Sequence, residues 1–223
     1  MNESQFVKLL EHKFASEGYV TQRELGVGYG IADLVLFKFN KNKCVIRRNN
    51  KQYKKLNNEV YFKIFDYLPE FGSKRKSRLE ILSKNLNISK NTLKYKYLKK
   101  LENDGFIRRV DENLYFKING WMPLAGEIIA IEAKMKDWKR GMFQANRYKS
   151  FAHKTFLAFP QEKGYLVDRE MLRKHNIGLI LFNVENREIK SIQPQKKIPL
   201  NWYKFNLASE FAINKRFLKE NFV

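Results

Sequence analysis

Two short stretches of the sequence place ionisable side chains inside apolar runs that otherwise have the composition of buried β-strands. The stretch EIIAIEAK (127–134) contains Glu132 and Lys134, and the stretch IADLVLFKF (31–39) contains Asp33 just before a run of apolar residues. A charge in such a place is unfavourable unless it is paired or used. Side chains alternate along a strand, so Glu132 and Lys134 share one face. We therefore expect these three residues to form a site.

Asp33 and Glu132 are suited to binding one divalent cation if their strands are antiparallel neighbours. Mg²⁺ takes oxygen ligands and commonly uses one or two carboxylates together with phosphate oxygens of a substrate. The carbonyl oxygen of Ala133 is a further candidate ligand. Lys134 beside such an ion would orient an attacking water or stabilise negative charge that develops on phosphorus. The pattern predicts a Mg²⁺ site, with Mn²⁺ as the alternative ion.

The excess of positive charge favours a polyanionic partner. The 223 residues carry 44 Lys and Arg against 23 Asp and Glu, a net charge of +21. Lys and Arg side chains that displace phosphate counterions supply most of the non-specific affinity for nucleic acids. Residues 41–118 have a net charge of +13, whereas residues 1–40 have a net charge of −1. The middle of the chain is therefore the main candidate for nucleic-acid binding, and charge that serves only solubility is the alternative.

Residues 41–118 have the pattern of short helices followed by a β-hairpin. A helix is predicted at 59–68, one or two helical turns within RLEILSKNLNIS (78–89), and a third helix from Ser89 as N-cap to a stop at Gly105. Residues 106–110 and 114–118 alternate as strands around a turn at 111–113. The residues expected to face inward are Val60, Ile64, Phe65, Leu68, Leu79, Leu82, Leu86, Leu93, Tyr97, Leu98 and Leu101.

The stretch ILSKNLNISKNTLKYKYLKKLENDGFIRRVDENLYFKI resembles a winged helix-turn-helix domain. In that family the third helix enters the major groove and the hairpin wing touches the DNA backbone. The resemblance implies that double-stranded DNA is the partner and that Asn91 reads a base edge while the lysines contact phosphates. A winged helix used only for protein contacts is the alternative. The implied DNA-binding residues are Lys90, Asn91, Thr92, Lys94, Tyr95, Lys96, Lys99, Arg108 and Arg109.

Residues 1–40 and 119–223 follow an α/β pattern. The predicted helices are 4–16, with Phe6, Leu10 and Phe14 on one face, then 138–152, 168–175 and a terminal helix with Phe205, Leu207, Phe211 and Phe217. The predicted strands are 19–25 and 31–39, joined by the turn GVGYG, then 127–134, 155–160 and 177–182. This order predicts helices on both faces of a mixed sheet. We expect one discontinuous domain, 1–40 with 119–223, interrupted by an inserted domain at 41–118.

Asp33 followed by Glu132-Ala133-Lys134 resembles the D…E-x-K signature of the PD-(D/E)XK, or restriction-endonuclease-like, nuclease superfamily. Ala32 stands where that family often has proline. The 98 residues between Asp33 and Glu132 shorten to 20, a normal distance for the family, once 41–118 is set aside. The resemblance implies a restriction-endonuclease-like core flanked by helices, and the activity of a metal-dependent DNA endonuclease.

The same resemblance implies further site residues. Gln144 and Tyr148 lie four apart on one helical face and match a Gln-x-x-x-Tyr-like pair that approaches substrate in many members. A glutamate in the first helix often contributes to the metal shell; Glu3 is the candidate here and Glu11 is the alternative. Ordinary structural roles remain open for each residue, such as an ion pair or a solvated helix end. The candidate catalytic residues are Asp33, Glu132, Lys134, Gln144, Tyr148 and Glu3.

Several classes of protein are disfavoured by composition. No apolar run reaches the roughly 18 residues of a membrane span, and the N-terminal sequence lacks a secretory pattern. A single cysteine, Cys44, expected to be a small apolar strand residue, suits a reducing cytoplasm. A homodimer would supply the two active sites that cleavage of both strands requires. The alternatives to a DNA endonuclease are a DNA-binding regulator with an inactive nuclease-like core, and a nuclease for branched DNA or RNA.

Overall fold

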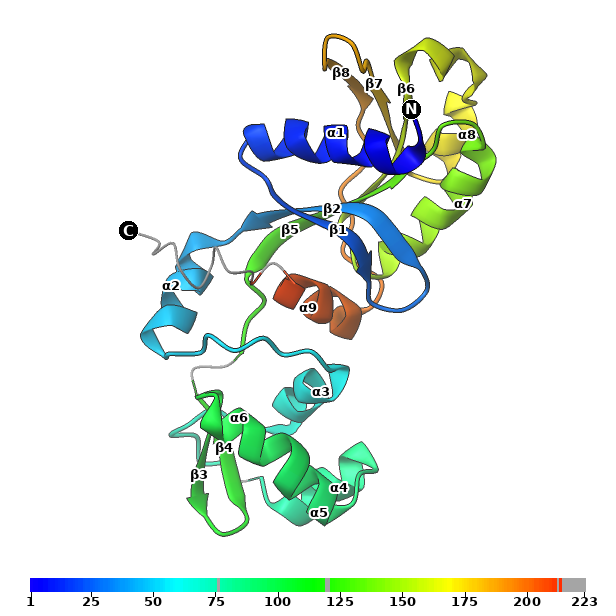
Figure 1. The fold of residues 1–223 in the computed structure, drawn as a ribbon. Helices are drawn as coiled ribbons and strands as arrows, with labels where there is room; N and C mark the ends of the chain where they lie inside the picture. Colours follow the sequence, from blue (N-terminus) through cyan, green and yellow to red (C-terminus); the bar gives the residue numbers. More distant parts are fainter. Residues whose placement is uncertain (76, 119–120, 212, 214–223) are drawn as a thin grey trace. The chain divides into compact units, whose positions relative to one another are not determined.

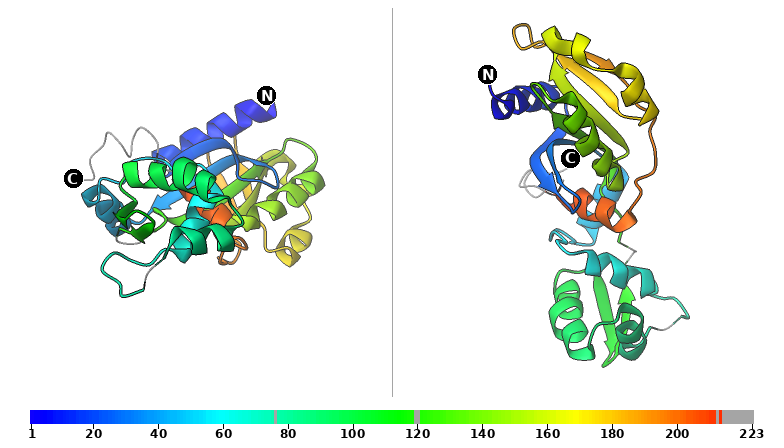
Figure 2. Two further views of the ribbon diagram at one scale, coloured as in Figure 1. Left: turned by 90° about the horizontal axis from the view of Figure 1, so that it is seen from below. Right: turned by 90° about the vertical axis from the view of Figure 1, so that its right-hand side faces the viewer.

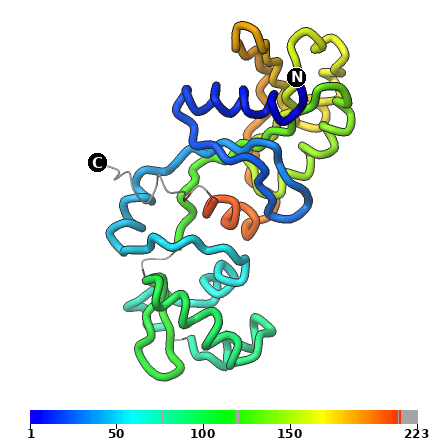
Figure 3. Tube along the Cα trace, in the orientation of Figure 1, coloured from blue at the N-terminus to red at the C-terminus, as the bar shows by residue number. Residues whose placement is uncertain are grey.

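The computed structural model describes residues 1–75, 77–118, 121–211 and 213, which fall into two compact units. Unit 1 comprises Met1–Phe39 and the described part of Ala125–Ala212, and unit 2 comprises Asn40–Leu124 and Ile213. The chain leaves unit 1 at Phe39 and returns at Ala125, as the trace in Figure 3 shows. Phe39 and Ala125 are paired residues of neighbouring strands. The segment predicted as the insertion, 41–118, lies within 40–124.

Unit 1 is built on a six-stranded mixed sheet with the strand order β1-β2-β5-β6-β7-β8. The β1-β2-β5 part is antiparallel, β5, β6 and β7 are parallel, and β8 is antiparallel to β7. The mixed α/β class is therefore confirmed, but the edge strand β8 was not predicted. The strand bounds are β1 (Val20–Gly26), β2 (Ile31–Phe39), β5 (Ala125–Ala133), β6 (Lys154–Pro160), β7 (Gly178–Phe182) and β8 (Ile189–Ile192).

Helices cover both faces of this sheet. Helix α1 packs on the face that contains Leu34 and Ile131, and α9 packs on the face that contains Val35 and Ile128. Figure 1 shows α1 above β1 and β2 and α9 below them, and Figure 2 gives two further views. The helices of unit 1 are α1 (Glu3–Ser16), α7 (Trp138–Arg147), α8 (Arg169–Lys174) and α9 (Trp202–Phe211), with short 3-10 segments η2 (Tyr148–Ser150) and η3 (Gln161–Leu166).

The first helix follows directly from its local sequence. Asn2 caps α1 by accepting a hydrogen bond from the Gln5 backbone N–H, and the Gln5 side chain accepts from the Asn2 N–H in return. Phe6, Leu10 and Phe14 recur at helical spacing and are buried against the sheet. The predicted amphipathic helix is confirmed.

Unit 2 contains the predicted helices and hairpin together with an additional helix. Its elements are α2 (Lys41–Asn49), α3 (Glu59–Tyr67), α4 (Leu79–Leu86), α5 (Lys90–Thr92), the π-helical segment η1 (Leu93–Leu98), α6 (Lys99–Asn103), and the antiparallel pair β3 (Ile107–Asp111) and β4 (Leu114–Lys117). The predicted inward residues are buried except Val60 and Leu86, which are half-buried, while Tyr61 and Phe62 are buried instead of Val60. Across the two units, the described residues contain nine α-helices.

The predicted third helix is divided by a π-helical turn. Ser89 caps it, as predicted, and Gly105 follows its end with a φ of 76°. Leu93 and Leu98 are both fully buried although they lie five residues apart. The i→i+5 spacing of a π-turn brings such a pair onto one face, where a regular α-helix would separate them. Burial of both leucines accounts for the departure from a regular helix.

Helix α2 is a correction to the sequence prediction. Cys44 is buried within this helix and is not a strand residue. Arg47 of the same helix is only 1% exposed, and its guanidinium donates to the carbonyl oxygens of Gln52 and Lys54 and lies 5.1 Å from the Phe106 ring centroid. The basic composition of KNKCVIRRN concealed the helix because its one buried cation is satisfied only in the tertiary structure.

Two predicted boundaries in unit 1 shift. The helix predicted at 138–152 is α-helical only to Arg147 and continues as the 3-10 turn η2 to Ser150. The terminal helix α9 buries Phe205, as predicted, while Phe217 lies outside the described residues. Nowhere in the described ranges is there a helix with the length and apolar character needed to cross a membrane.

We expect Leu10→Ala to lower the free energy of unfolding of unit 1 by about 2–5 kcal/mol, because the side chain is fully buried between α1 and the sheet and its removal leaves a cavity. Urea unfolding monitored by circular dichroism measures the change. Lys8→Ala, on the exposed side of the same helix, is the control. Equal unfolding midpoints for the two variants would contradict the packing described here.

Candidate active site

The register between β2 and β5 places Asp33 and Glu132 on one face of the sheet. Leu34 pairs with Ile131 in this antiparallel ladder, and one further step sets Asp33 opposite Glu132. Opposed residues of an antiparallel pair project to the same side. At this end of the ladder a side-chain hydrogen bond joins the two strands: Asp33 Oδ2 accepts from the Ala133 backbone N–H at 2.8 Å. The neighbouring strands are visible in Figure 1.

Glu132 is 1% exposed and contacts two side chains of the predicted site. Its Oε1 lies 2.7 Å from the Lys134 ammonium, and its Oε2 lies 2.5 Å from the Tyr148 hydroxyl. The Tyr148 hydroxyl also lies 2.7 Å from the carbonyl oxygen of Ile31, so its single proton serves two acceptors. Strand alternation had predicted that Glu132 and Lys134 share a face, with an ion pair between them as the structural alternative. That Tyr148 approaches the site was implied only by the family resemblance.

Burial shapes the protonation of these groups. It raises the pKa of Glu132, against the opposing hydrogen bonds from Lys134 and Tyr148. Burial likewise raises the pKa of Asp33, against the hydrogen bond from the Ala133 N–H. Burial alone would lower the pKa of Lys134, but the carboxylates of Glu132, Asp33 and Glu3 raise it above its ordinary value. The site therefore holds a lysine whose charge the carboxylates stabilise, beside two carboxylates whose ionised form burial disfavours.

The two candidate glutamates of the first helix occupy different places. Glu3 Oε2 lies 3.6 Å from the Lys134 ammonium, and Glu3 Oε1 accepts from the Met135 N–H at 3.4 Å. Glu11 instead forms an ion pair with Arg23 at 2.8 Å on β1. The structure thus brings Glu3, rather than Glu11, to the catalytic candidates.

Helix α7 passes close to Lys134 at a glycine. A Cβ atom at Gly141 would lie 2.6 Å from Leu157 Cδ1 and 2.7 Å from Lys134 Cγ, which is closer than real side chains approach. Gly141 therefore allows the helix to pack against the lysine stem. Sequence reasoning missed this residue, because a glycine in a predicted helix gives no sign of what it approaches.

The outer side of α7 forms a basic hollow. Gln144 is half-buried at its wall, and the Gln144 Oε1 atom is buried without a hydrogen-bond partner in the described part of the chain. The hollow measures about 520 Å³ and is lined by Asp137, Lys139, Arg140, Phe143, Gln144 and Arg147. Its three cations suit phosphate groups. Arg147 was not predicted as a site residue.

The residues that could hold a hard divalent cation here are two carboxylates. Asp33 and Glu132 share one face of the sheet, and Glu132 Oε1 lies 2.7 Å from the Lys134 ammonium. Across the described ranges, no group of three or more His, Cys, Asp and Glu side chains is arranged to hold a metal ion. An ion held by Asp33 and Glu132 would thus complete its shell with water, phosphate oxygens or the Ala133 carbonyl, as Mg²⁺ commonly does.

In unit 2 the predicted DNA-binding residues are exposed, except Lys94, which is half-buried. Several of them have protein partners: Lys90 pairs with Glu80 at 3.3 Å, Lys94 lies 3.9 Å from Glu112, and the Thr92 hydroxyl accepts from Ser89 at 2.9 Å. Exposed residues of the predicted set are Lys90, Asn91, Thr92, Tyr95, Lys96, Lys99, Arg108 and Arg109.

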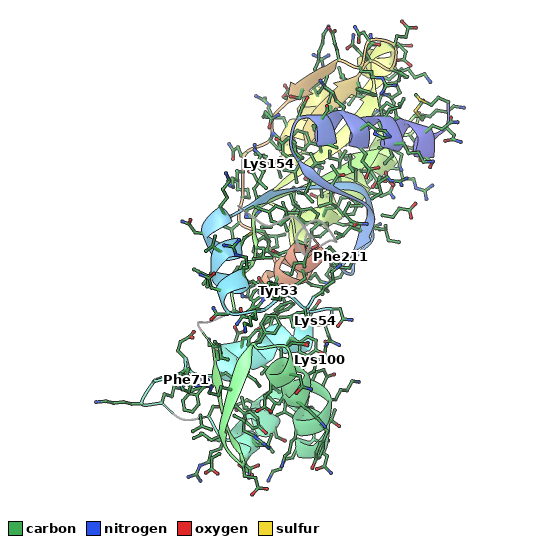
Figure 4. The ribbon with its side chains drawn as sticks, turned by 60° about the vertical axis from the view of Figure 1, so that its left-hand side comes forward. Tyr53, Lys54, Phe71, Lys100, Lys154 and Phe211 are labelled. Carbon is green, nitrogen blue, oxygen red and sulfur yellow. The ribbon has the colours of Figure 1, made fainter. Side chains whose placement is uncertain are left out.

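The β3-β4 hairpin makes an aromatic contact that the sequence did not predict. The Arg108 guanidinium lies 4.6 Å from the centroid of the Phe71 ring, and Phe71, labelled in Figure 4, is 50% exposed. Phe71 also packs edge-to-face on Phe116 of β4 at 6.1 Å. Arg109 lies 3.9 Å from Glu102. The Phe71 ring therefore restrains the Arg108 guanidinium, whose planar group carries several N–H donors.

Comparison of the chain with protein-family models, with curated proteins and with solved structures gives no match in any of the three. The site is therefore interpreted from its own geometry and chemistry.

We expect Asp33→Asn to stabilise unit 1 near neutral pH. The raised pKa of Asp33 means that its ionised form is disfavoured in the folded state, so stability is lost as pH rises from the unfolded pKa through the folded pKa. Asparagine keeps an acceptor for the Ala133 N–H without the charge. In thermal melts from pH 3 to pH 8, the melting temperature of the variant relative to wild type should increase as pH rises. A difference that does not change with pH would contradict the raised pKa of Asp33.

Proposed function

We propose that the protein is a metal-dependent DNA endonuclease whose unit 1 is a restriction-endonuclease-like catalytic core. The observation that supports this most directly is the joint placement of Asp33, Glu132 and Lys134 at the end of one strand pair. The β1-β2-β5 meander followed by α7 and the parallel strand β6 agrees with the expected core. Charges of both signs are gathered in an otherwise apolar sheet, where structure alone gains little from them.

The residues take separate roles in this proposal. A divalent cation bound by Asp33 and Glu132 would supply acidification of a water and neutralisation of phosphate charge. Lys134 orients the attacking water and stabilises the negative charge that grows on the phosphate oxygens. Tyr148 holds the Glu132 carboxylate by its hydroxyl, and Glu3 holds the Lys134 ammonium within 3.6 Å. Gln144 and the cations of α7 contact the phosphates beside the cut.

Unit 2 supplies duplex affinity in this proposal. Its exposed third helix carries lysines around Asn91, and its hairpin carries Arg108 and Arg109. Their contacts with phosphates would be independent of sequence and sensitive to salt, while Asn91 would read a base edge. The net charge of +13 over residues 41–118 agrees with this role.

The catalytic assignment predicts that Glu132→Gln abolishes Mg²⁺-dependent cleavage of plasmid DNA. The rate should fall by more than the ~10–100-fold typical of changes outside a metal's direct ligands. The matched control is Glu127→Gln, because Glu127 is a buried glutamate of the same strand that pairs with Lys38 and Lys196. Gel assays with Mg²⁺, Mn²⁺ or EDTA measure the rate.

Equal cleavage by the Glu132 and Glu127 variants, or cleavage that EDTA leaves unchanged, would refute the assignment. DNA binding without cleavage by the wild-type protein under all metal conditions would instead favour a regulator with an inactive core. Lys134→Met tests the lysine separately, with Lys136→Ala, a neighbour on the same segment, as its control.

The DNA-binding assignment predicts that Lys96→Ala combined with Lys99→Ala weakens binding of every duplex by a similar factor. The slope of log affinity against log salt should become shallower by about 0.9 for each phosphate that the variant no longer neutralises. Fluorescence anisotropy with two unrelated duplexes measures both quantities. A control pair, Lys74→Ala with Lys84→Ala, removes the same charge from exposed positions elsewhere in unit 2. If this control loses the same affinity, net charge explains the effect and the DNA-binding assignment of Lys96 and Lys99 is contradicted.

A further inference from the structure

The turn between β1 and β2 holds an exposed aromatic ring in an unusual backbone conformation. Gly28, Tyr29 and Gly30 have φ values of 94°, 62° and 124°, so three consecutive residues lie in the left-handed region. A tyrosine there is disfavoured and persists only where its surroundings impose it. The Tyr29 side chain is 69% exposed, and Ile31, the first residue of β2, is 61% exposed. An apolar pair is thus displayed to solvent by a strained turn.

Lys204 of α9 holds this turn in place. Its ammonium donates to the Val27 carbonyl oxygen at 2.8 Å and lies 4.4 Å from the centroid of the Tyr29 ring. The φ of 94° at Gly28 favours glycine, and a Cβ atom there would lie 2.3 Å from the Lys204 ammonium, which would have to move away. With 69% of Tyr29 exposed, the ammonium on one side leaves most of the ring open. The turn therefore presents a ring for contact and does not bury one.

The turn is also tied to the catalytic candidates. The Ile31 carbonyl oxygen accepts a hydrogen bond from the Tyr148 hydroxyl at 2.7 Å, and the same hydroxyl contacts Glu132. A Cβ atom at Gly30 would lie 3.6 Å from the Tyr148 ring and 3.9 Å from Arg147 Cδ. Tyr29 thus lies two residues from the Tyr148 contact at Ile31, and its neighbour Gly30 lies close to the Arg147 side chain.

We propose that Tyr29 stacks on an unpaired nucleobase, and that this site therefore prefers DNA with an unpaired nucleotide at the cut, such as forks, flaps or junctions, over a fully paired duplex. Open aromatic rings bind bases by stacking, which requires a base face that an intact duplex keeps inside its own stack. Arg147, whose side chain lies close to Gly30, provides a cation for the flanking phosphates. The position of the cut rests on the proposed nuclease function, whereas the base contact does not.

The test uses the full chain carrying Glu132→Gln, so that binding is measured without cleavage. A forked DNA with 2-aminopurine at its first unpaired position should lose fluorescence on binding, and the same sequence as a closed duplex should not. Tyr29→Ala should remove this quenching and weaken forked-DNA binding by about tenfold. Tyr29→Phe should retain both, because it keeps the ring. Tyr165→Ala, which removes an 81% exposed tyrosine of η3, is the matched control.

Equal quenching and affinity with Tyr29→Ala would overturn the proposal. So would an equal loss of affinity on forked and closed DNA, or a change from dimer to monomer in light scattering that accounts for the loss. Failure of Tyr29→Phe to retain binding would show that the hydroxyl or the fold, and not stacking, matters. Absence of cleavage by the wild-type chain on every substrate, with quenching intact, would refute the nuclease function and leave the base contact standing.

Discussion

The antiparallel register of β2 against β5 is the constraint on which the site depends. Because side chains alternate, a slip of one residue would send Asp33 and Glu132 to opposite faces. The register is fixed by apolar partners further along the ladder, where Val35 pairs with Ala130 and Phe37 with Ile128 beneath α9. The carboxylates are therefore positioned by core packing, and their own interactions contribute only the last bond, from Ala133 to Asp33.

The buried ionisable groups of the site cost folding stability, because apolar residues could fill the same positions in the core. Glu132 is fully buried and its pKa is raised, although Lys134 and Tyr148 both stabilise its charge. A buried ion pair gives little net stability compared with apolar residues of similar volume. Compensation comes from the surrounding apolar clusters, so the chain can hold a charged strand end without losing its fold. This pattern is typical of sites that favour chemistry over stability.

The sequence allowed most elements and the central residues to be predicted, because these follow from local rules. Strand alternation placed Glu132 beside Lys134, amphipathic spacing located α1, and the Ser89 cap located the third helix of unit 2. What failed depends on distant partners. Helix α2 contains an arginine that is satisfied only when buried, and β8 is too short and polar to stand out. Gly141 and Tyr29 carry meaning only through what surrounds them in three dimensions.

The acidity of the candidate site itself sets a requirement on the rest of the chain. In the proposed function a phosphodiester would have to approach two carboxylates, so cations placed elsewhere would have to attract the nucleic acid. The sequence supplies them in two groups, one on the outer side of α7 and one over residues 41–118. In this proposal, long-range attraction and local chemistry would be carried by different residues. Changing one positive residue would then cause a graded loss of affinity, whereas Asp33 and Glu132 would have no substitutes.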